Sequence, residues 1–338
     1  MEPITPHAFE NLGAVEKRPD PMDIMLGTAV AVKYTHPKVL TNNTAWAMPI
    51  EYQGNQPACS AHSGAEIKDL SLGSRFTPRF TWADLKTFDG WPINSGSDIR
   101  SIFKSITKNG ALDFAQLGND VSLSLVDYAT PPTQVQRNLA IKHSGMGYGF
   151  ITDLTFDGLK QFITDHGPTI ILMRVNNRFW TAADGHTSWA EKDILPLAPS
   201  SPQWPVVSGH FVVAHSFDED NIYFVNHFSS GWGRNGHGYF GADYMKDIND
   251  AGALFPLGFT KDLSLGMTDG DVKMLQEYLN KKGYAVAPAG HPGSSGMETL
   301  YFGPATQAAL KRLQAAHGIS PISGYFGPLT RAYVALNP

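Results

Sequence analysis

The chain has 338 residues, of which 42% are hydrophobic and only 17% charged, so it is long enough for two globular domains and too apolar to be disordered over most of its length. Its formal net charge is −5 and no run of basic residues is longer than two, which argues against nucleic acid as a partner. The longest apolar stretches are only as long as β-strands, whereas a helix needs roughly 20 apolar residues to cross a bilayer. We therefore expect a globular protein without a membrane span.

The first part of the chain has the pattern of helices followed by strands. Residues 1–45 are rich in Pro, Asn and Thr and predict an extended arm. Apolar spacings of mostly three and four residues then predict helices, and short apolar runs between turns predict strands, an order that indicates an α+β fold. The glycine-rich segment 145–149 is interpreted as a flexible turn, because it lacks the features of a phosphate loop. The helices are expected over 57–70, 97–108 and 155–165, and the strands over 169–175, 211–215, 222–226 and 238–241.

A different pattern begins near residue 259. The motif Tyr-Phe-Gly-Pro-Ala-Thr at 301–306 recurs as Tyr-Phe-Gly-Pro-Leu-Thr at 325–330, and in each copy Pro follows Gly as it does at many helix starts. Amphipathic helices are expected over 269–282 and 304–317. We therefore predict three parts, an extended arm (1–45), a first domain (46–258) and a small helical domain (259–338).

The single cysteine, Cys59, excludes an intrachain disulfide and a centre built from several thiolates. It is expected in the first turn of a helix, where unpaired amides and the helix dipole favour the reactive thiolate. A lone cysteine is also often a small buried apolar residue. Its position alone therefore leaves both interpretations open.

Three polar residues favour the nucleophile. Gln53 lies six residues before Cys59, and its amide is suited to stabilise an oxyanion together with the Cys59 backbone N–H. His210 precedes a strand and is suited to act first as a base and then as an acid. Asn226 ends the next strand, 16 residues later, where its amide oxygen can accept the second imidazole N–H and orient the ring.

These residues lie in blocks that resemble the papain-like cysteine peptidase family. Residues 53–61 are similar to its Gln-Gly-x-x-x-x-Cys-Trp-Ala block, 209–213 to its His block, and 226–236 to its Asn-Ser-Trp-Gly-x-x-Trp-Gly-x-x-Gly block. The resemblance implies a two-lobed domain, with a helical lobe followed by a β lobe, that hydrolyses peptide bonds through a thioester. The catalytic residues it implies are Cys59, His210, Asn226 and Gln53.

The same resemblance indicates where substrate binds. Asn94-Ser95-Gly96 is similar to the Asn-Gly-Gly segment that pairs with the substrate backbone in the family. Two residues depart from the pattern, since Ser60 stands where the family usually has Trp, and Phe228 replaces the Trp that shields the Asn–His hydrogen bond. Phe228 still supplies an apolar cover. The expected substrate-binding residues are Ser95, Gly96, Gly209 and Trp232.

The remaining histidines suggest no metal site and no cofactor. His62 follows Cys59 by three residues, but no second Cys/His pair at zinc spacing lies nearby, so His62 is interpreted as a core or surface residue. His215, His227 and His237 are interpreted as surface residues or neighbours of the site, and His227 is the one expected to contact the cleft because it follows Asn226.

Residues 262–338 resemble the small three-helix peptidoglycan-binding domain family through their duplicated Phe-Gly-Pro-x-Thr helix starts. The resemblance implies a peptidase that acts on a protein or peptide and is targeted to the cell wall, at the cell envelope or outside the cell. Residues 1–6 lack the features of a secretory signal, so the compartment stays open. Two alternatives remain: a wall lysin that cuts peptidoglycan stem peptides, and a wall-binding protein without catalysis. The small domain is alternatively a folded cap or a docking module.

Overall fold

The computed structural model describes residues 14–15, 17, 20, 23, 25–26, 36–176, 206–256, 259 and 261–337. The chain forms two compact units, which are described separately below. The first comprises 1–144 and 148–254, and the second comprises 145–147 and 255–338. None of the described helices is long and apolar enough to span a bilayer.

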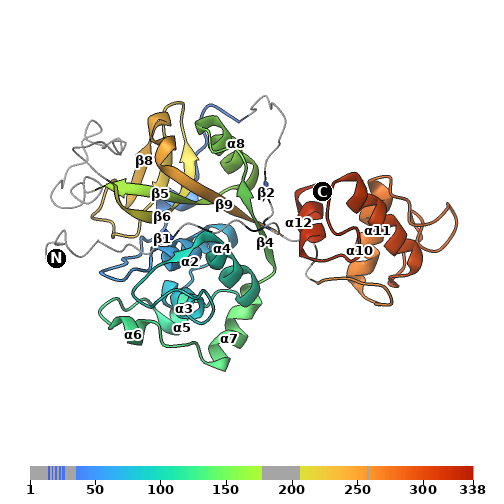
Figure 1. The fold of residues 1–338 in the computed structure, drawn as a ribbon, viewed down its shortest axis with the longest axis horizontal. Helices are drawn as coiled ribbons and strands as arrows, with labels where there is room; N and C mark the ends of the chain where they lie inside the picture. The colour runs from blue at the N-terminus through green and yellow to red at the C-terminus, as the bar shows by residue number, and fades with distance from the viewer. Residues whose placement is uncertain are drawn as a thin grey trace. The chain divides into compact units, whose positions relative to one another are not determined.

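The helical half of the first unit is built around α2 (Cys59–Leu72), whose residues 59–69 are all buried. The helix packs against α3, α4 and the strands β5 and β6, and it lies between the other helices and the sheet in Figure 1. Gly64 permits this packing, because a Cβ atom there would lie 2.9 Å from Cγ2 of Ile102. The other helices of this half are α3 (Pro78–Leu85), α4 (Ile99–Lys104), α5 (Phe114–Leu117), α6 (Leu125–Tyr128) and α7 (Gln134–Ala140). The short helix α1 (Asn43–Ala47) instead lies against the sheet, where Trp46 packs on His215, Tyr223 and His237.

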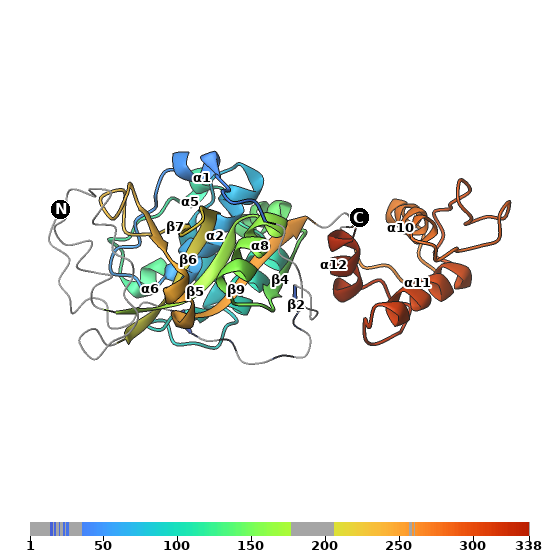
Figure 2. The same cartoon turned by 90° about the horizontal axis from the view of Figure 1, so that it is seen from above.

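The other half is a seven-stranded sheet with the order β2-β4-β9-β5-β6-β7-β8. Strand β5 pairs antiparallel with β6 and β9, and β6 continues antiparallel through β7 to β8. Helix α8 (Phe156–His166) packs on β5 and β6, and Figures 1 and 2 show it against the sheet. The strands are β2 (Met25–Leu26), β4 (Met146–Ile151), β5 (Thr169–Asn176), β6 (Val206–Phe217), β7 (Ile222–Val225), β8 (His237–Phe240) and β9 (Ile248–Pro256).

The α+β fold and the main helices and strands expected from the sequence are confirmed, with three local differences. The strand expected over 211–215 begins earlier, at Val206, so His210 lies inside β6 and does not precede it. The segment 145–149 is not a turn, because β4 begins at Met146. The helix expected over 97–108 is α4 followed by a π-helical turn, Ser105–Asn109, and it ends at Gly110. The bounds proposed for the arm and the two domains stay predictions; within the arm, α1 already begins at Asn43.

The second unit contains α10 (Gly270–Lys281), α11 (Pro304–Ala316) and α12 (Pro328–Leu336). Their apolar faces enclose a core of their own, in which the two phenylalanines of the repeated motif, Phe302 and Phe326, are fully buried. Both motifs also place Pro in the first turn of the following helix, as the sequence predicts.

In each copy of the repeat, a buried glutamine of the preceding helix makes the same pair of hydrogen bonds. Gln276 Nε2 on α10 donates to Thr306 Oγ1 (2.9 Å) and to the carbonyl of Tyr301 (3.1 Å). Gln314 Nε2 on α11 donates to Thr330 Oγ1 (3.0 Å) and to the carbonyl of Tyr325 (2.9 Å). Each helix thus holds the start of the next through one side-chain amide, so the sequence repeat is also a repeat of structure.

Replacement of Gln276 by alanine leaves Thr306 and the Thr299 backbone N–H, which donates to Gln276 Oε1 at 2.7 Å, without these partners. We expect the free energy of unfolding of the second unit to fall by about 1–3 kcal/mol, because buried polar groups lose their hydrogen bonds. Hydrogen exchange of the α10, α11 and α12 amides in the full chain measures the loss. Glu277→Ala, the neighbouring exposed residue on α10, is the control; equal effects of the two variants would contradict the prediction.

Candidate active site

Cys59 is the first residue of α2, as the sequence predicts, and its side chain is fully buried. Burial raises the pKa of the thiol from 9.0 to about 12, although hydrogen bonds with the backbone of Phe211, Ser60 and Cys59 itself lower it. The contact with Phe211 brings the sulfur to strand β6, one residue from His210. The N-terminus of α2 and the middle of β6 therefore meet at the thiol.

His210 and Asn226 are joined by a hydrogen bond of 2.8 Å between Nε2 and Oδ1. The backbone N–H of His227 donates to the same Oδ1 at 2.9 Å, and a donor at that position identifies the atom as the oxygen of the amide. Nε2 of His210 must therefore carry the proton, which leaves Nδ1 as the basic nitrogen of the neutral ring. Burial lowers the pKa of His210 to about 3, whereas the bond to Asn226 raises it.

Gln53 is buried, and its Nε2 donates one hydrogen bond, to the carbonyl of Gln56 at 2.7 Å. A side-chain amide has two N–H donors, and among the residues that the structure describes the second has no acceptor, so it is suited to bind a ligand. The backbone N–H of Gln53 donates to the carbonyl of His227 at 2.7 Å. This contact ties the segment before α2 to the residue that follows Asn226.

Phe228 covers His210, because the two rings stack with their centroids 5.3 Å apart and an interplanar angle of 14°. Trp232 is only 3% exposed and packs against Phe228 and Phe224. The structure therefore places Trp232 in the packing below the site, and its role as a substrate-binding residue stays a prediction.

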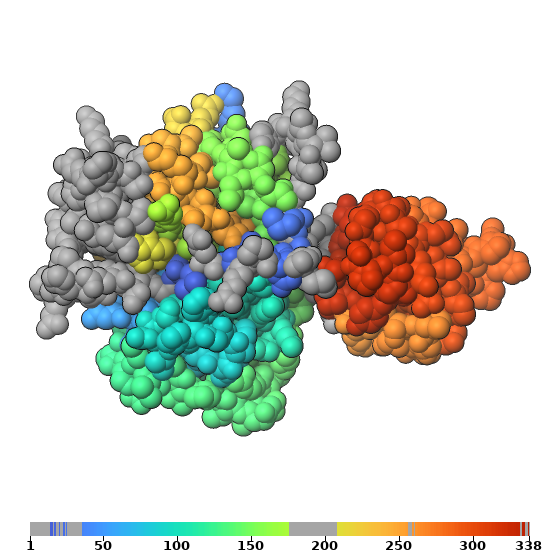
Figure 3. Space-filling view, in the orientation of Figure 1, coloured from blue at the N-terminus to red at the C-terminus, as the bar shows by residue number. Residues whose placement is uncertain are grey.

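The other expected substrate-binding residues lie beside the N-terminal arm. Strand β1 (Ala14–Val15) pairs in parallel with β3 (Ser97–Asp98), directly after Ser95 and Gly96. A Cβ atom on Gly209 would lie 3.2 Å from the carbonyl oxygen of Ala14. The arm thus runs between the two segments expected to contact substrate, and Figure 3 shows its described residues in blue where the helical and sheet halves meet.

Two ion pairs hold the arm to the rest of the first unit. Both carboxylate oxygens of Asp23 accept hydrogen bonds from the guanidinium of Arg100, each at 2.6 Å. Lys17 Nζ lies 3.0 and 2.9 Å from the carboxylate oxygens of Asp250. Bidentate and partly buried pairs of this kind fix position better than exposed ones.

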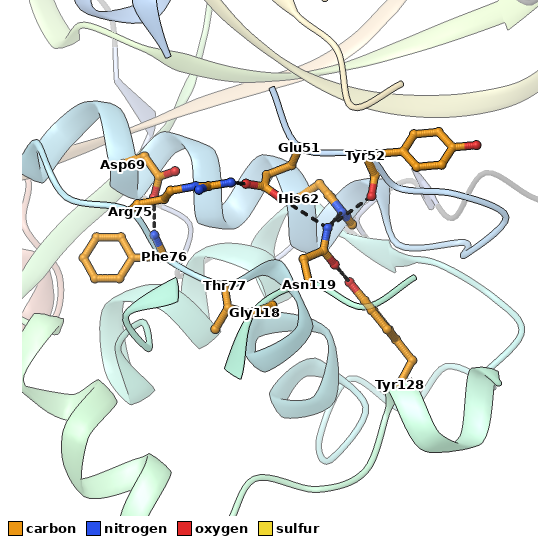
Figure 4. A network of polar contacts seen from close by, with 10 residues as sticks. All are labelled: Glu51, Tyr52, His62, Asp69, Arg75, Phe76, Thr77, Gly118, Asn119 and Tyr128. Carbon is orange, nitrogen blue, oxygen red and sulfur yellow. Dashed lines mark hydrogen bonds and ion pairs between the residues drawn. The ribbon is translucent and has the colours of Figure 1, made fainter. Parts of the chain in front are cut away.

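The histidines near the site are buried rather than exposed, which corrects the surface interpretation of His215, His227 and His237. His62 Nδ1 contacts the carbonyl of Ala58 at 2.9 Å, directly before Cys59. Its Nε2 lies 3.3 Å from Nδ2 of Asn119, in the polar network that Figure 4 shows around Glu51 and Tyr128. Burial lowers the pKa of His62 to about 3, and His227 lowers it further.

His227 reaches a residue that the sequence did not single out. Its Nε2 lies 2.7 Å from Oε2 of Glu66 on α2, and both side chains are buried. Glu66 follows Cys59 by seven residues, a spacing that places both on one face of a helix and was a usable signal. Within the described residues, no three His, Cys, Asp or Glu side chains are arranged to hold a metal ion.

Comparisons with solved structures give the fold of the first part of the chain. Xylellain, a cysteine protease from Xylella fastidiosa, matches with a TM-score of 0.60 and 16% identity over 72% of this chain and 94% of its own. Procathepsin B S9 from Trypanosoma congolense matches with a TM-score of 0.55 and 13% identity over 76% and 90%. Procathepsin L2 from the larval midgut of Tenebrio molitor also scores 0.55, with 13% identity over 74% and 80%. The chain therefore contains a papain-like cysteine protease fold.

Comparison with sequence families identifies the last part. Residues 268–334 match the family described as "Putative peptidoglycan binding domain". A comparison with curated proteins finds no match. The molecule thus combines a papain-like protease fold with a peptidoglycan-binding domain, as the resemblances in the sequence imply.

The raised pKa of Cys59 predicts how the alkylation rate of the thiol depends on pH. Below a pKa of about 12 the thiolate fraction rises about tenfold per pH unit, so alkylation of the full chain by iodoacetamide should accelerate in that way between about pH 6 and 9. Mass spectrometry of the Cys59 peptide gives the rate. A rate that does not change over this range would mean that a thiolate–imidazolium pair already exists.

A matched pair of variants tests whether the arm limits access to the thiol. Asp23→Asn weakens the bidentate pair with Arg100, whereas Asp20 lies 3.9 Å from Arg100 and is more exposed. We expect Asp23→Asn to raise the alkylation rate at every pH and Asp20→Asn to change it little. Equal rates in the parent and Asp23→Asn would show that the arm does not protect the site.

Proposed function

We propose that the protein is a cysteine peptidase in which Cys59 is the nucleophile. The observation that carries this proposal is the His210–Asn226 hydrogen bond of 2.8 Å beside a buried thiol at the start of α2. The papain-like fold supports the same assignment. The positions of the other two expected residues support it as well, since Asn226 directly follows β7 and the backbone N–H of Gln53 donates to the carbonyl of His227.

In the proposed reaction His210 Nδ1 takes the thiol proton, and the Cys59 sulfur attacks the carbonyl carbon of the scissile bond. The second N–H of Gln53 and the backbone N–H of Cys59 stabilise the oxyanion. His210 then returns the proton to the amine as the C–N bond breaks, which leaves a thioester. Water, deprotonated by His210, hydrolyses the thioester and regenerates the thiol, while Asn226 keeps the ring oriented.

The arm is proposed to hold the enzyme in a closed state. Strand β1 occupies an edge beside Ser95 and Gly96 and also lies against Gly209, all of which are expected to bind substrate. Burial favours the neutral thiol of Cys59 and the neutral imidazole of His210, and a neutral thiol is expected in an enzyme that is not turning over.

Turnover separates the proposed roles of the catalytic residues. Cys59→Ala should reduce turnover to background, because no other residue of the chain has a thiol. Asn226→Ala should reduce it less, because the imidazole is misoriented but present. A peptide library with chromatography of the products measures both. Turnover above a tenth of the parent's in Cys59→Ala would refute the nucleophile, and equal losses in two folded variants would refute a purely orienting Asn226.

The second unit is proposed to target the enzyme to peptidoglycan, since residues 268–334 match a family of that description. Residues 262–338 carry six Lys or Arg against five Asp or Glu, so recognition by charge alone is not expected. Tyr301 and Tyr325 occupy the same place in the two repeats and are 51% and 44% exposed. The exposed faces of these rings are suited to bind sugars or peptides, whereas the hydroxyl of Tyr325 donates to Oδ2 of Asp262.

Retention on purified, insoluble peptidoglycan tests the targeting. The full chain with Cys59→Ala should bind, and added salt should weaken binding little because the contacts are not ionic. Tyr301→Ala and Tyr325→Ala should lower retention, whereas Glu277→Ala on the same unit should not. Loss of all retention at moderate salt, or none at low salt, would assign the unit a docking or capping role.

The proposed substrate is a protein or peptide, and a wall lysin that cuts stem peptides is the second candidate, favoured by the peptidoglycan-binding family match. Soluble muropeptides released from purified peptidoglycan would identify the lysin. Cleaved proteins without released muropeptides would identify the general peptidase. A folded chain that releases neither and does not react with an epoxide thiol inhibitor would be a binding protein.

A further inference from the structure

Next to the site lies His227, a histidine that takes no part in the proposed proton transfers but is hydrogen-bonded to two of the proposed catalytic residues. The backbone N–H of His227 donates to Oδ1 of Asn226 at 2.9 Å. Its carbonyl accepts from the backbone N–H of Gln53 at 2.7 Å. The orienting residue and the oxyanion residue are therefore both hydrogen-bonded to the main chain of this one residue.

The side chain of His227 is fixed from the opposite half of the first unit. Its Nε2 lies 2.7 Å from Oε2 of Glu66 on α2, the helix that begins with Cys59. Cys59, His62 and Glu66 are spaced by three and four residues and so share one face of α2, with Glu66 about 10 Å along the axis from Cys59. A single hydrogen bond thus connects the helix of the nucleophile with the segment of Asn226.

The contacts of His227 also define its protonation. Its Nδ1 is buried without a hydrogen-bond partner among the described residues, so a proton there would be costly. The proton therefore belongs on Nε2, which donates to Glu66. The titratable groups that face His227 are Glu66 and His62 from α2 and His210 from β6, and Glu51 acts on Glu66 from the segment before α2.

We propose that His227 is a positioning residue, and that its hydrogen bond to Glu66 sets the orientation of Asn226 and His210 relative to Cys59. The proposal rests on the proposed function for its effect on turnover, but its effect on His210 does not depend on turnover. When the bond is lost, the residue-227 main chain shifts, Oδ1 of Asn226 loses its second donor, and the amide is free to rotate away from His210 Nε2.

The variants separate positioning from stability. Glu66→Met removes the hydrogen bond at similar size, and Glu66→Gln keeps an acceptor oxygen for Nε2. The double variant Glu66→Met with His227→Phe removes both polar partners and so avoids an unpaired buried group. Asp69→Leu is the control, because Asp69 is also a buried acid on α2 but binds the Phe76 backbone, away from the site.

In the full chain we expect Glu66→Met and the double variant to lower kcat on the order of 10- to 100-fold, with KM changed less than about twofold, because misplaced catalytic groups slow the reacting step. Glu66→Gln should stay within about threefold of the parent across the pH profile. Asp69→Leu should lower the thermal midpoint without a comparable loss of kcat. If folded Glu66→Met keeps the parental kcat, or Asp69→Leu loses as much, the proposal is wrong.

A second measurement does not need a substrate. In the Cys59→Ala background, nitrogen-15 NMR of the imidazoles should show His210 with its proton on Nε2, and Glu66→Met or the double variant should add the other tautomer or exchange broadening. An unchanged His210 spectrum would overturn the proposal. If the parent chain neither turns over peptides nor reacts with an epoxide thiol inhibitor, the proposed peptidase function fails, and this spectrum alone decides the role of His227.

Discussion

The burial of a polar helix is the constraint on which the rest of the first unit depends. A helix enclosed by protein is usually apolar all round, yet α2 buries Ser, His, Glu, Lys and Asp side chains between two halves of the unit. Each of these groups loses water and needs a partner. Lys68 donates to the carbonyl of His143, and Asp69 accepts from the Phe76 backbone at 2.7 Å. One partner lies in the segment that follows α2 and the other 75 residues along the chain, so the helix depends on both for its stability.

The same constraint explains how a site can be ordered without disulfides. With one cysteine in the chain, the helical half and the sheet are held by apolar packing and by directional contacts such as the 2.7 Å contact between Glu66 and His227. Hydrogen bonds in a buried, low-dielectric place fix angles as well as distances. The orientation of the His210 ring therefore depends on the position of α2 as well as on β6, the strand that carries His210.

The sequence predicted the features that local rules determine. Cys59 begins α2, His210 lies within β6 and Asn226 directly follows β7, each inside a recognisable block, so the elements that carry them could be predicted. Strand β4 was missed because its glycines have the pattern of a turn, whereas a Cβ on Gly147 would collide with Phe255 and one on Gly252 would lie 2.9 Å from the carbonyl of Gly149. Those glycines permit close packing. The pairing of β1 with β3 was also missed, because two-residue strands leave no periodic signal.

In the function proposed above, the second unit acts on catalysis through the local concentration of substrate. A binding module linked to an enzyme raises the local concentration of any substrate attached to the same surface, with a gain set by the length of the linker. The higher local concentration makes encounters between enzyme and substrate more frequent and therefore lowers the apparent KM for wall-bound substrate. The reacting groups and kcat stay unchanged. A freely diffusing peptide gains nothing. In the two-part molecule proposed here, the position of α2 controls the rate of the chemical step. The two repeated helix starts, each with an exposed tyrosine, control which substrates reach the active site.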